Sequence, residues 1–339
     1  MRVLVVGGGS IGLLMAGRLA LGSAEVHLVC RTKEQAESIA AQGITVTALN
    51  GTKQTVHPVS ITAFDEALAA ALPSAESTWS WILLTVKQKD INAALIQWLK
   101  TQMLGETKLV GFQNGIGHME LLAEMLSQSR LFAAVTTEGA KRESETVVLQ
   151  TGRGTVWLGR AFAGNRQTAA PGPSAAEHGE GYLMDGETQA LIQVLREAGV
   201  DARADGAMPV RIWNKLIVNA VINPLTAISG VKNGELLEDA WRRELAGKLY
   251  EEAREVALSL GIPIADDLWE QIVAVCKRTA ANHSSMLQDR MERRKTEIDW
   301  INGSLLKLAH RQGIPCPNHE SIVRQVKALE DQYLSGETF

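Results

Sequence analysis

The sequence predicts an α/β protein of two domains, the first built on a mainly parallel β-sheet and the second made of helices alone. Over residues 1–206, short apolar strands alternate with helical stretches, a pattern typical of a parallel sheet covered by helices on both faces. Over residues 207–339, apolar residues recur at helical spacing without a convincing strand. A chain of 339 residues is long enough for each domain to bury a substantial core.

The composition excludes several classes of partner. The formal net charge is −4, with 21% charged and 45% hydrophobic residues, so no basic excess favours nucleic acid or an anionic membrane. The three cysteines are odd in number and far apart, which argues against a disulfide framework and fits a reducing cytoplasm. No run of about eighteen apolar residues predicts a transmembrane helix. Three consecutive glycines interrupt the apolar N-terminal stretch, which argues against a signal peptide.

The first domain is expected to begin with strands and helices in alternation. VLVV is a strand, the next helix extends to about Leu21, EVHLVC is a second strand, and KEQAESIAAQ is a second helix. Three later apolar runs, WILLTV, KLVGF and LFAAVTT, predict short buried strands with helical stretches between them. TQALIQVLREAGVDARAD adds a last helix and strand, so the domain boundary is placed near Gly206.

Two antiparallel pairs and one loop are expected within the same domain. Asn50-Gly51 predicts a hairpin with a type I′ turn inside ITVTALNGTKQTVHPVSIT. VVLQTGRGTVWLG predicts a second antiparallel pair, added at an edge. Residues 163–187 are rich in Ala, Gly and Pro and have no period, which indicates a mobile surface loop inside the first domain.

The second domain is expected to be all helix. Four long stretches show helical spacing, and no internal repeat is found. These stretches are PVRIWNKLIVNAVINPLTAI, ELLEDAWRRELAGKLYEEAREVALSLG, DLWEQIVAVCKRTAAN and EIDWINGSLLKLAHRQG.

The first glycines form a G-x-G-x-x-G motif, Gly7, Gly9 and Gly12, between a strand and a helix. Glycines at these positions allow a tight turn, a close approach of the backbone to a pyrophosphate, and close packing of the helix on the strand. The helix that begins near Ser10 and Ile11 would direct its N-terminal N–H groups at that pyrophosphate. Several strand-helix units follow the motif, which favours a Rossmann-type dinucleotide-binding domain over the alternative of a purely structural turn.

Arg31 ends the second strand, nineteen residues after Gly12, where an NAD-binding protein usually presents a carboxylate to the ribose 2′-hydroxyl. An arginine attracts a 2′-phosphate, which a carboxylate repels. The sequence therefore favours NADP(H) over NAD, with Lys33 as a second cation. The alternative is a solvated Arg31 ahead of a helix that begins with a capping box, Thr32 and Gln35.

Lys215, Asn219 and Asn223 lie at i, i+4 and i+8 of an otherwise apolar helix, so they form one polar stripe. Buried polar groups must find partners or face a cleft. Pro224 lacks a backbone donor and should bend the helix, freeing the carbonyl of Ala220. A partly desolvated Lys215 would have a lowered pKa, suited to protonating an oxygen near neutral pH. The alternative is a lysine that extends to solvent beside two packing asparagines.

The segment WNKLIVNAVINPLTAI and the NGEL that follows it resemble the ketopantoate reductase (2-dehydropantoate 2-reductase) family. NHSSMLQDRMERRKTEIDWINGSLL, and LTVKQ and FQNGIG in the first domain, extend the resemblance over essentially the whole chain. It implies an N-terminal Rossmann domain, a helical C-terminal domain, and a cleft between them in which ketopantoate is reduced to pantoate with NADPH.

The resemblance also assigns roles to single residues. It makes Lys215 the general acid and Glu297 the active-site glutamate. Lys87 of TVK and Asn114 of QNG match residues near the cofactor and the substrate carbonyl, although they could equally be a surface charge and a turn residue. The remaining implied substrate contacts are polar side chains of the second domain: Asn219, Asn223, Asn233 and Ser285.

Ser285 and Glu297 each have a structural interpretation as well. Ser285 with Gln288, and Thr296 with Asp299, have the spacing of capping boxes. Ser285 and Glu297 could therefore simply begin helices.

Two other functions stay open, a related two-domain reductase acting on a different 2-oxo acid and a non-catalytic NADP-sensing module. The seven histidines include no pair at metal-ligand spacing, so no metal is expected. The expected partner is a small molecule, with neither nucleic acid nor membrane, and the oligomeric state is open, with a homodimer as one alternative.

Overall fold

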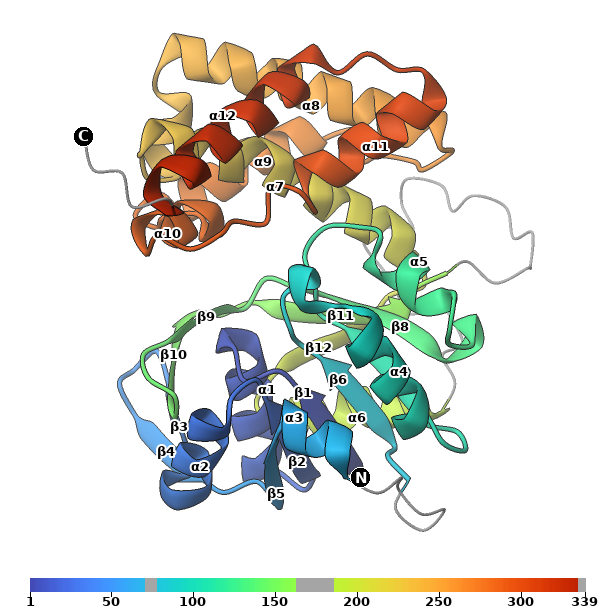
Figure 1. The fold of residues 1–339 in the computed structure, drawn as a ribbon. Helices are drawn as coiled ribbons and strands as arrows, with labels where there is room; N and C mark the ends of the chain where they lie inside the picture. Colours follow the sequence, from blue (N-terminus) through green and yellow to red (C-terminus); the bar gives the residue numbers. More distant parts are fainter. Residues whose placement is uncertain (71–77, 163–185, 335–339) are drawn as a thin grey trace. The chain divides into compact units, whose positions relative to one another are not determined.

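The computed structural model describes residues 1–70, 78–162 and 186–334, and the chain divides into two compact units (Figure 1). The first unit contains Met1–Gln113 and His118–Met208, and the second contains Asn114–Gly117 and the chain from Pro209 onward. The division after Met208 lies two residues beyond the boundary expected at Gly206. Most of the loop predicted at 163–187 lies outside the described residues, and Gly186 already begins a helix.

An eight-stranded sheet forms the centre of the first unit. In chain order its strands are β1 (Arg2–Val6), β2 (Glu25–Cys30), β5 (Ser60–Ala63), β6 (Trp81–Leu84), β7 (Lys108–Gly111), β8 (Leu131–Thr136), β11 (Thr155–Arg160) and β12 (Asp201–Ala204). They lie in the order β5-β2-β1-β6-β7-β8-β11-β12, and all neighbours are parallel except β8 and β11. The first six strands along the chain thus take the order 3-2-1-4-5-6 of a Rossmann domain, which confirms the predicted fold class.

The alternation of side chains along β1 gives each face of this sheet its own core. Val3 and Val5 pack with α1 (Ser10–Leu21) and α6 (Gly186–Glu197) on one face, and Leu4 and Val6 pack with α4 (Ala93–Gln102) and α5 (His118–Ala123) on the other. The carboxyl ends of β1 and β6 lie where the strand order reverses, which is the ligand-binding edge of such sheets. The helices of the unit are α1 (Ser10–Leu21), α2 (Lys33–Gln42), α3 (Phe64–Ala69), α4 (Ala93–Gln102), α5 (His118–Ala123) and α6 (Gly186–Glu197), with 3₁₀ turns η2 (Gln88–Asp90) and η3 (Gln128–Arg130).

A smaller sheet packs against α1, in the order β4-β3-β10-β9. Its strands are β3 (Ile44–Thr47), β4 (Lys53–Val56), β9 (Gly139–Arg142) and β10 (Val147–Gly152). Gly17 allows the close approach of α1, because a Cβ there would lie 2.5 Å from Cγ2 of Val46. The predicted hairpin is the β3–β4 pair. Its turn is not type I′, since that type requires positive φ at both central residues and Asn50 does not have it, whereas Gly51 has φ +81°.

The pairing predicted within VVLQTGRGTVWLG is wrong, because β10 and β11 belong to different sheets. β10 pairs with β9, and β11 pairs with β8. The chain crosses between the sheets near Gly154, where a Cβ would lie 2.2 Å from the carbonyl carbon of Thr137. The continuous segment β8–β9 therefore runs antiparallel to the segment β10–β11, and each segment contributes one strand to each sheet. Strand periodicity cannot distinguish this arrangement from a hairpin between β10 and β11.

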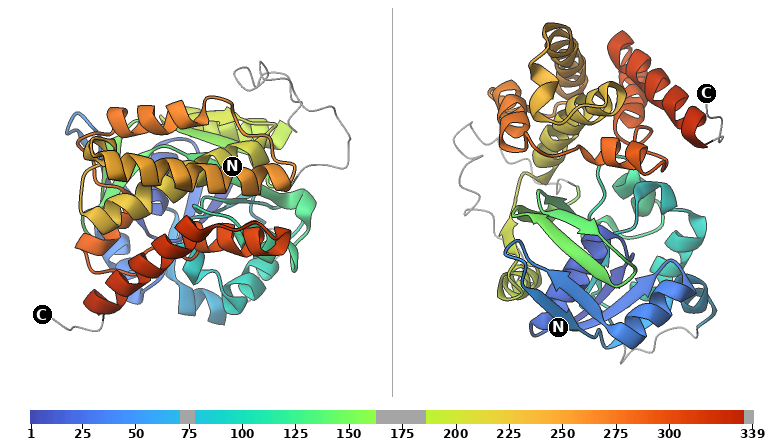
Figure 2. Two further views of the ribbon diagram at one scale, coloured as in Figure 1. Left: turned by 90° about the horizontal axis from the view of Figure 1, so that it is seen from above. Right: turned by 90° about the vertical axis from the view of Figure 1, so that its left-hand side faces the viewer.

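In its described part the second unit is helical and contains no strand, as predicted (Figures 1 and 2). Two element boundaries differ from the prediction. Asp239 caps α8 (Ala240–Ser259) by accepting from the backbone N–H of Arg242, so ELL before it is a separate 3₁₀ turn. The segment from Glu297 to Ile301 forms turns, and the helix begins at Asn302. The elements are α7 (Met208–Ser229), η6 (Gly234–Leu237), α8 (Ala240–Ser259), α9 (Leu268–Arg278), α10 (Ser285–Met291), α11 (Asn302–Gln312) and α12 (Pro317–Leu334).

Across the described residues, no helix combines the length and the apolar character that crossing a lipid bilayer requires.

Candidate active site

The loop after β1 leaves no room for a side chain at two of its three motif glycines. Gly7 has φ +119°, a backbone conformation that residues with a side chain rarely adopt. A Cβ on Gly12 would lie 1.8 Å from the carbonyl oxygen of Gly7. A Cβ on Gly9, in contrast, would meet nothing within 4 Å. Packing explains Gly7 and Gly12, whereas Gly9 borders open space and fits the close approach of a pyrophosphate.

The N-terminus of α1 fits an anion. Gly9 is its N-cap, no side chain caps the helix, and the first turn contains no acidic residue. The N–H groups at Ser10 and Ile11 have no acceptor within the helix, and the helix dipole favours negative charge at this end. The Ser10 hydroxyl accepts from the backbone N–H of Arg142 at 3.1 Å, which ties the start of the helix to β9.

Two side chains that sequence reasoning missed support the glycine loop. The Thr85 hydroxyl, at the end of β6, lies 3.0 Å from the carbonyl oxygens of both Val6 and Gly7. The Gln35 amide is buried and donates to the carbonyl of Gly8 at 2.8 Å. Only half of the predicted capping box is therefore present, because Thr32 accepts from the backbone of Gln35 but the Gln35 side chain turns to the loop. The position of Thr85 in the TVK motif, two residues before Lys87, is the sequence feature that could have indicated its role at this loop.

Arg31 and Lys87 lie after β2 and β6, on either side of β1 at the carboxyl edge of the sheet. The Arg31 side chain is 68% exposed, and its guanidinium pairs with Asp90 of η2 at 2.8 Å. Lys87 is half-buried and immediately precedes η2. Lys33 pairs with one glutamate on α2 at 3.8 Å and one on α3 at 3.9 Å. An exposed guanidinium at this edge fits a 2′-phosphate, and Asp90 is a neighbour that the sequence did not predict.

In the second unit, α7 carries the predicted polar stripe. Lys215 is half-buried, and two residues close to it in sequence, Trp213 and Leu216, are buried. Burial lowers the pKa of the Lys215 ammonium to about 8, and the negative charge of Glu297 opposes this by raising the pKa. A lysine with such a pKa can donate a proton near neutral pH, whereas a fully solvated lysine holds it much more firmly.

Glu297 lies in the turn before α11 and therefore does not begin a helix. Its Oε2 accepts from Nδ2 of Asn114 at 3.3 Å. Asn114 belongs to the short 114–117 segment of the second unit, where Ile116 packs against the helical core. The structure thus brings together Lys215, Glu297 and Asn114, of which the last two are 183 positions apart.

Two further predicted residues meet between α7 and α10. Asn223 is 5% exposed, and its Nδ2 donates to Oγ of Ser285 at 3.4 Å. The N-cap of α10 is Ser284, which accepts from the backbone N–H of Leu287, so the alternative interpretation of Ser285 as the cap of this helix is wrong. Ser285 is exposed, and Asn219 is half-buried one turn before Asn223. The Ser285 hydroxyl and the Asn223 amide therefore lie together at the end of the polar stripe, where they could bind a polar ligand.

Asn233, the remaining predicted substrate contact, lies at the start of η6. It is 7% exposed, and its Nδ2 donates to Oγ1 of Thr279 at 2.9 Å. Its Oδ1 is buried without a hydrogen-bond partner among the described residues. Among the described residues Asn233 bonds Thr279 rather than Lys215 or Asn223, and its buried, unpaired acceptor fits a ligand that donates a hydrogen bond.

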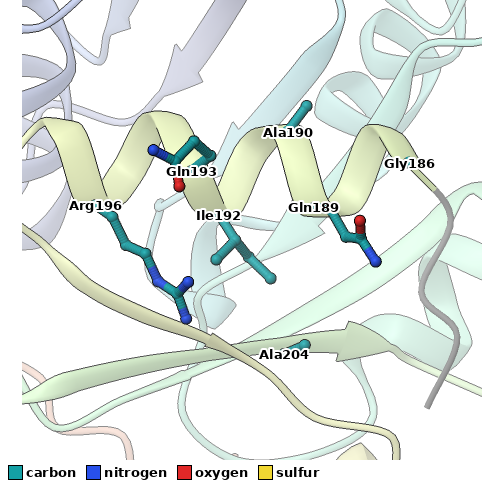
Figure 3. A pocket seen from close by; sticks show the side chains of 7 residues that line it. All are labelled: Gly186, Gln189, Ala190, Ile192, Gln193, Arg196 and Ala204. Atoms are coloured by element: carbon teal, nitrogen blue, oxygen red, sulfur yellow. The ribbon is translucent and has the colours of Figure 1, made fainter. Parts of the chain in front are cut away.

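A pocket of about 490 Å³ lies in the first unit, between α6 and β12 (Figure 3). The side chains of Gln189, Ile192 and Arg196 point from α6 toward the strand, where Arg196 donates to the carbonyl of Ala202. None of the predicted site residues lines it. Among the residues that the structure describes, no three His, Cys, Asp or Glu side chains gather as a metal site would require.

Comparison with known proteins covers nearly the whole chain. Residues 3–162 match the family described as ketopantoate reductase PanE/ApbA, and residues 208–330 match its C-terminal part. The 2-dehydropantoate 2-reductase of Archaeoglobus fulgidus is 30% identical, and that of Bacillus subtilis is 31% identical. Each match covers 97% of this chain and 98% of the relative.

Solved structures share the fold. A PanE/ApbA family ketopantoate reductase from Ralstonia eutropha JMP134 superposes with a TM-score of 0.81 at 23% identity, over 98% of this chain and 100% of the other. D-mandelate dehydrogenase with NADH and anilino(oxo)acetate gives a TM-score of 0.82 at 22% identity, over 98% and 99%. The solved structures show a shared fold, whereas the sequence matches identify the family. The chain belongs to the ketopantoate reductase family.

Proposed function

We propose that this protein reduces the C2 carbonyl of ketopantoate to the hydroxyl of pantoate, with NADPH as the hydride donor. The observation that carries the proposal is Lys215 of α7, a half-buried lysine with a lowered pKa that interacts electrostatically with Glu297, the carboxylate to which Asn114 donates. The relatives that match the whole chain are named for this reaction.

Lys215 performs the protonation step. Its ammonium donates a proton to the carbonyl oxygen as negative charge develops there. A pKa near 8 leaves the group protonated at neutral pH while making it a stronger acid than a solvated lysine. Glu297 keeps the pKa from falling further, and its hydrogen bond from Asn114 holds the carboxylate in place. When bound, the reduced dinucleotide supplies the hydride that the carbonyl carbon accepts.

The first unit supplies the residues for the dinucleotide. Gly7, Gly9 and Gly12, with the N–H groups of Ser10 and Ile11, would hold the pyrophosphate. Arg31 is the reason to propose NADPH, because an exposed guanidinium makes a charge-assisted bond to a 2′-phosphate. Lys87 would lie beside the cofactor, as the family resemblance implies.

The second unit supplies polar groups for the substrate. Asn223 and Ser285 offer an amide and a hydroxyl at one end of the stripe, with Asn219 one turn before. Asn114 would contact the substrate carbonyl, and the acceptor oxygen of Asn233 would take a substrate hydroxyl. A small hydroxylated 2-oxo acid uses all of these groups, whereas a purely apolar 2-oxo acid leaves several unsatisfied.

A spectrophotometric assay tests the proposal by following NADPH oxidation with and without ketopantoate. Smaller and aromatic 2-oxo acids are offered in parallel, since the D-mandelate dehydrogenase structure of similar fold was solved with an aryl-substituted oxo acid. The expected result is the highest kcat/KM with ketopantoate. A higher value with another acid would favour the related reductase, and NADPH binding without any turnover would favour the sensing module.

We also propose that the protein is cytoplasmic and that it forms a homodimer. Cys30, Cys276 and Cys316 are all buried free thiols, which suits a reducing compartment. Light scattering of the purified protein measures the oligomeric state directly, and a mass of about 73 kDa, twice the 36.7 kDa of one chain, is expected for the dimer.

A further inference from the structure

We propose that Asn302 is a positioning residue for the site on α7, an inference that rests on the proposed function. A proline has no backbone N–H, so Pro224 leaves the carbonyl of Ala220 without its usual donor in the helix. Asn302, at the start of α11, supplies that donor, because its Nδ2 lies 2.8 Å from the Ala220 oxygen. Pro224 predicts the freed carbonyl from sequence alone, whereas nothing local in the sequence predicts Asn302 as its donor.

The carbonyl lies inside the polar stripe. Ala220 directly follows Asn219 and precedes Asn223 by three residues, so the bond from Asn302 acts on the turn that holds both amides. Both Ala220 and Asn302 are 0% exposed. Water cannot replace the amide at a fully buried carbonyl without opening the core, so the contact is fixed in the folded state.

Asn302 is itself held by a buried histidine. Its amide also lies 3.0 Å from Nδ1 of His319, and Nε2 of the same ring lies 2.9 Å from the carbonyl of Leu249. Because a carbonyl only accepts, Nε2 carries the hydrogen and Nδ1 accepts from Asn302. Burial lowers the pKa of His319, so the ring is neutral, as this arrangement needs. The chain of bonds therefore ties α7 to α8 through α11 and α12.

The same short segment carries Glu297. The backbone N–H groups of Trp300 and Ile301 donate to the Glu297 carbonyl at 3.1 and 3.0 Å, so the turn from Glu297 to Asn302 is closely wound. One end of this turn places the carboxylate near Lys215, and the other end binds the Ala220 carbonyl. Asn302 thus fixes the position of the Glu297 turn relative to α7.

Asn302→Ala tests the proposal, with kcat, KM for the 2-oxo acid, Kd for NADPH and Tm measured together. We expect kcat to fall about tenfold at temperatures well below Tm, and the Kd to stay within about twofold. Asn318→Ala is the control, since that half-buried amide donates to Glu252 and none of its hydrogen bonds among the described residues reaches α7. It should lower Tm and leave kcat unchanged. Wild-type kcat in Asn302→Ala would exclude a positioning role.

The double variant Pro224→Ala/Asn302→Ala distinguishes two roles of Asn302, positioning the Glu297 turn and supplying a hydrogen bond to the Ala220 carbonyl. It also tests the proposal if Asn302→Ala alone does not fold. Alanine at 224 returns a backbone N–H to the Ala220 carbonyl but not the link to the Glu297 turn. Recovery of Tm without recovery of kcat supports the proposal, and recovery of both contradicts it. The assay uses the 2-oxo acid that the wild type reduces. Absence of turnover with ketopantoate therefore counts against the proposed function, and equal turnover of variant and wild type counts against this inference.

Discussion

The glycine loop and the stripe on α7 are built from different parts of the polypeptide. In the loop, Gly7, Gly9 and Gly12 act by lacking a side chain, and the groups offered to a ligand are backbone N–H groups. On α7 the groups are side chains, and they depend on partners from α10 and from the turn before α11. The groups that the loop offers to a ligand all come from one strand–helix connection, which Thr85 and Gln35 support from outside, whereas the groups of the stripe meet partners from distant parts of the chain.

The difference predicts how each site fails. A backbone site is damaged by added atoms, since any Cβ in the wrong place forces the chain apart. A side-chain site is damaged by removed atoms, since the loss of one donor or one charge leaves the fold in place and the chemistry incomplete. Substitutions of single residues can therefore break one site while the other keeps its binding.

Lys215→Ala should have the largest effect on turnover. Positioned acid catalysis contributes about 10² to 10⁴ in rate, or roughly 2.7 to 5.4 kcal/mol of barrier, and kcat should fall by that factor. Folding lowers the pKa of this lysine, so its ammonium destabilises the folded state at neutral pH and the variant should not melt earlier. The Kd for NADPH, measured by titration, should stay within about threefold of wild type.

The pH profile gives an independent check on Lys215. The ammonium must be protonated to act, so wild-type turnover should fall as the pH rises through about 8. That limb should be absent in Lys215→Ala. Lys248→Ala, a surface lysine of α8 that pairs with Glu244, is the matched control and should retain both rate and profile. More than about a tenth of wild-type turnover in Lys215→Ala would remove the residue from the mechanism.

Gly12→Ala and Gly9→Ala test the backbone site as a pair. At position 12 the new Cβ would overlap a backbone oxygen, so we expect a loss of about 3 kcal/mol in stability and of NADPH binding with it. At position 9 the Cβ enters open space, so stability should stay within about 0.5 kcal/mol of wild type while NADPH binding weakens. Chemical denaturation and nucleotide titration measure the two effects. Unchanged binding in Gly9→Ala would show that no ligand approaches there.

Arg31→Asp should change the choice of nucleotide. A charge-assisted bond to the 2′-phosphate contributes roughly 1.5 to 3 kcal/mol, so NADPH should bind about ten- to hundredfold more weakly and NADH little differently. Asp90→Asn is the companion variant, because the Asp90 carboxylate now pairs with this guanidinium. Releasing Arg31 should strengthen NADPH binding relative to NADH. Equal affinity of the wild type for both nucleotides would contradict the assignment.

The parts predicted from sequence are those fixed by local spacing. G-x-G-x-x-G after a strand and Lys215, Asn219 and Asn223 on one helix face follow directly from strand and helix periods. The carbonyl of Ala220 was predicted to lose its helix donor because Pro224 removes one specific bond. Each of these needs no knowledge of what lies across the fold.

The parts that failed depend on pairing across the chain. The strand periodicity of β10 and β11 predicts one hairpin, whereas their true partners, β9 and β8, are set by where two segments cross between the sheets. Ser284 and Ser285 both suit an N-cap, and only the packing of α10 on α7 decides between them. Asp90 and Asn302 have no local signature, since each acts on a residue far away in sequence.

Glu297→Gln is the smallest expected effect and the sharpest test of the side-chain site. The amide oxygen still accepts from Asn114, so the variant removes charge while keeping the hydrogen bond. Because the Glu297 charge raises the pKa of Lys215, its loss should move the alkaline limb of the rate profile to lower pH. We expect turnover to fall about tenfold, or roughly 1.4 kcal/mol, at unchanged Tm. Glu292→Gln, on the exposed turn after α10, is the control and should leave the limb in place. A limb at the wild-type pH in Glu297→Gln would show that the carboxylate does not act on Lys215, and the two residues would then have to be treated as separate features of the helical unit.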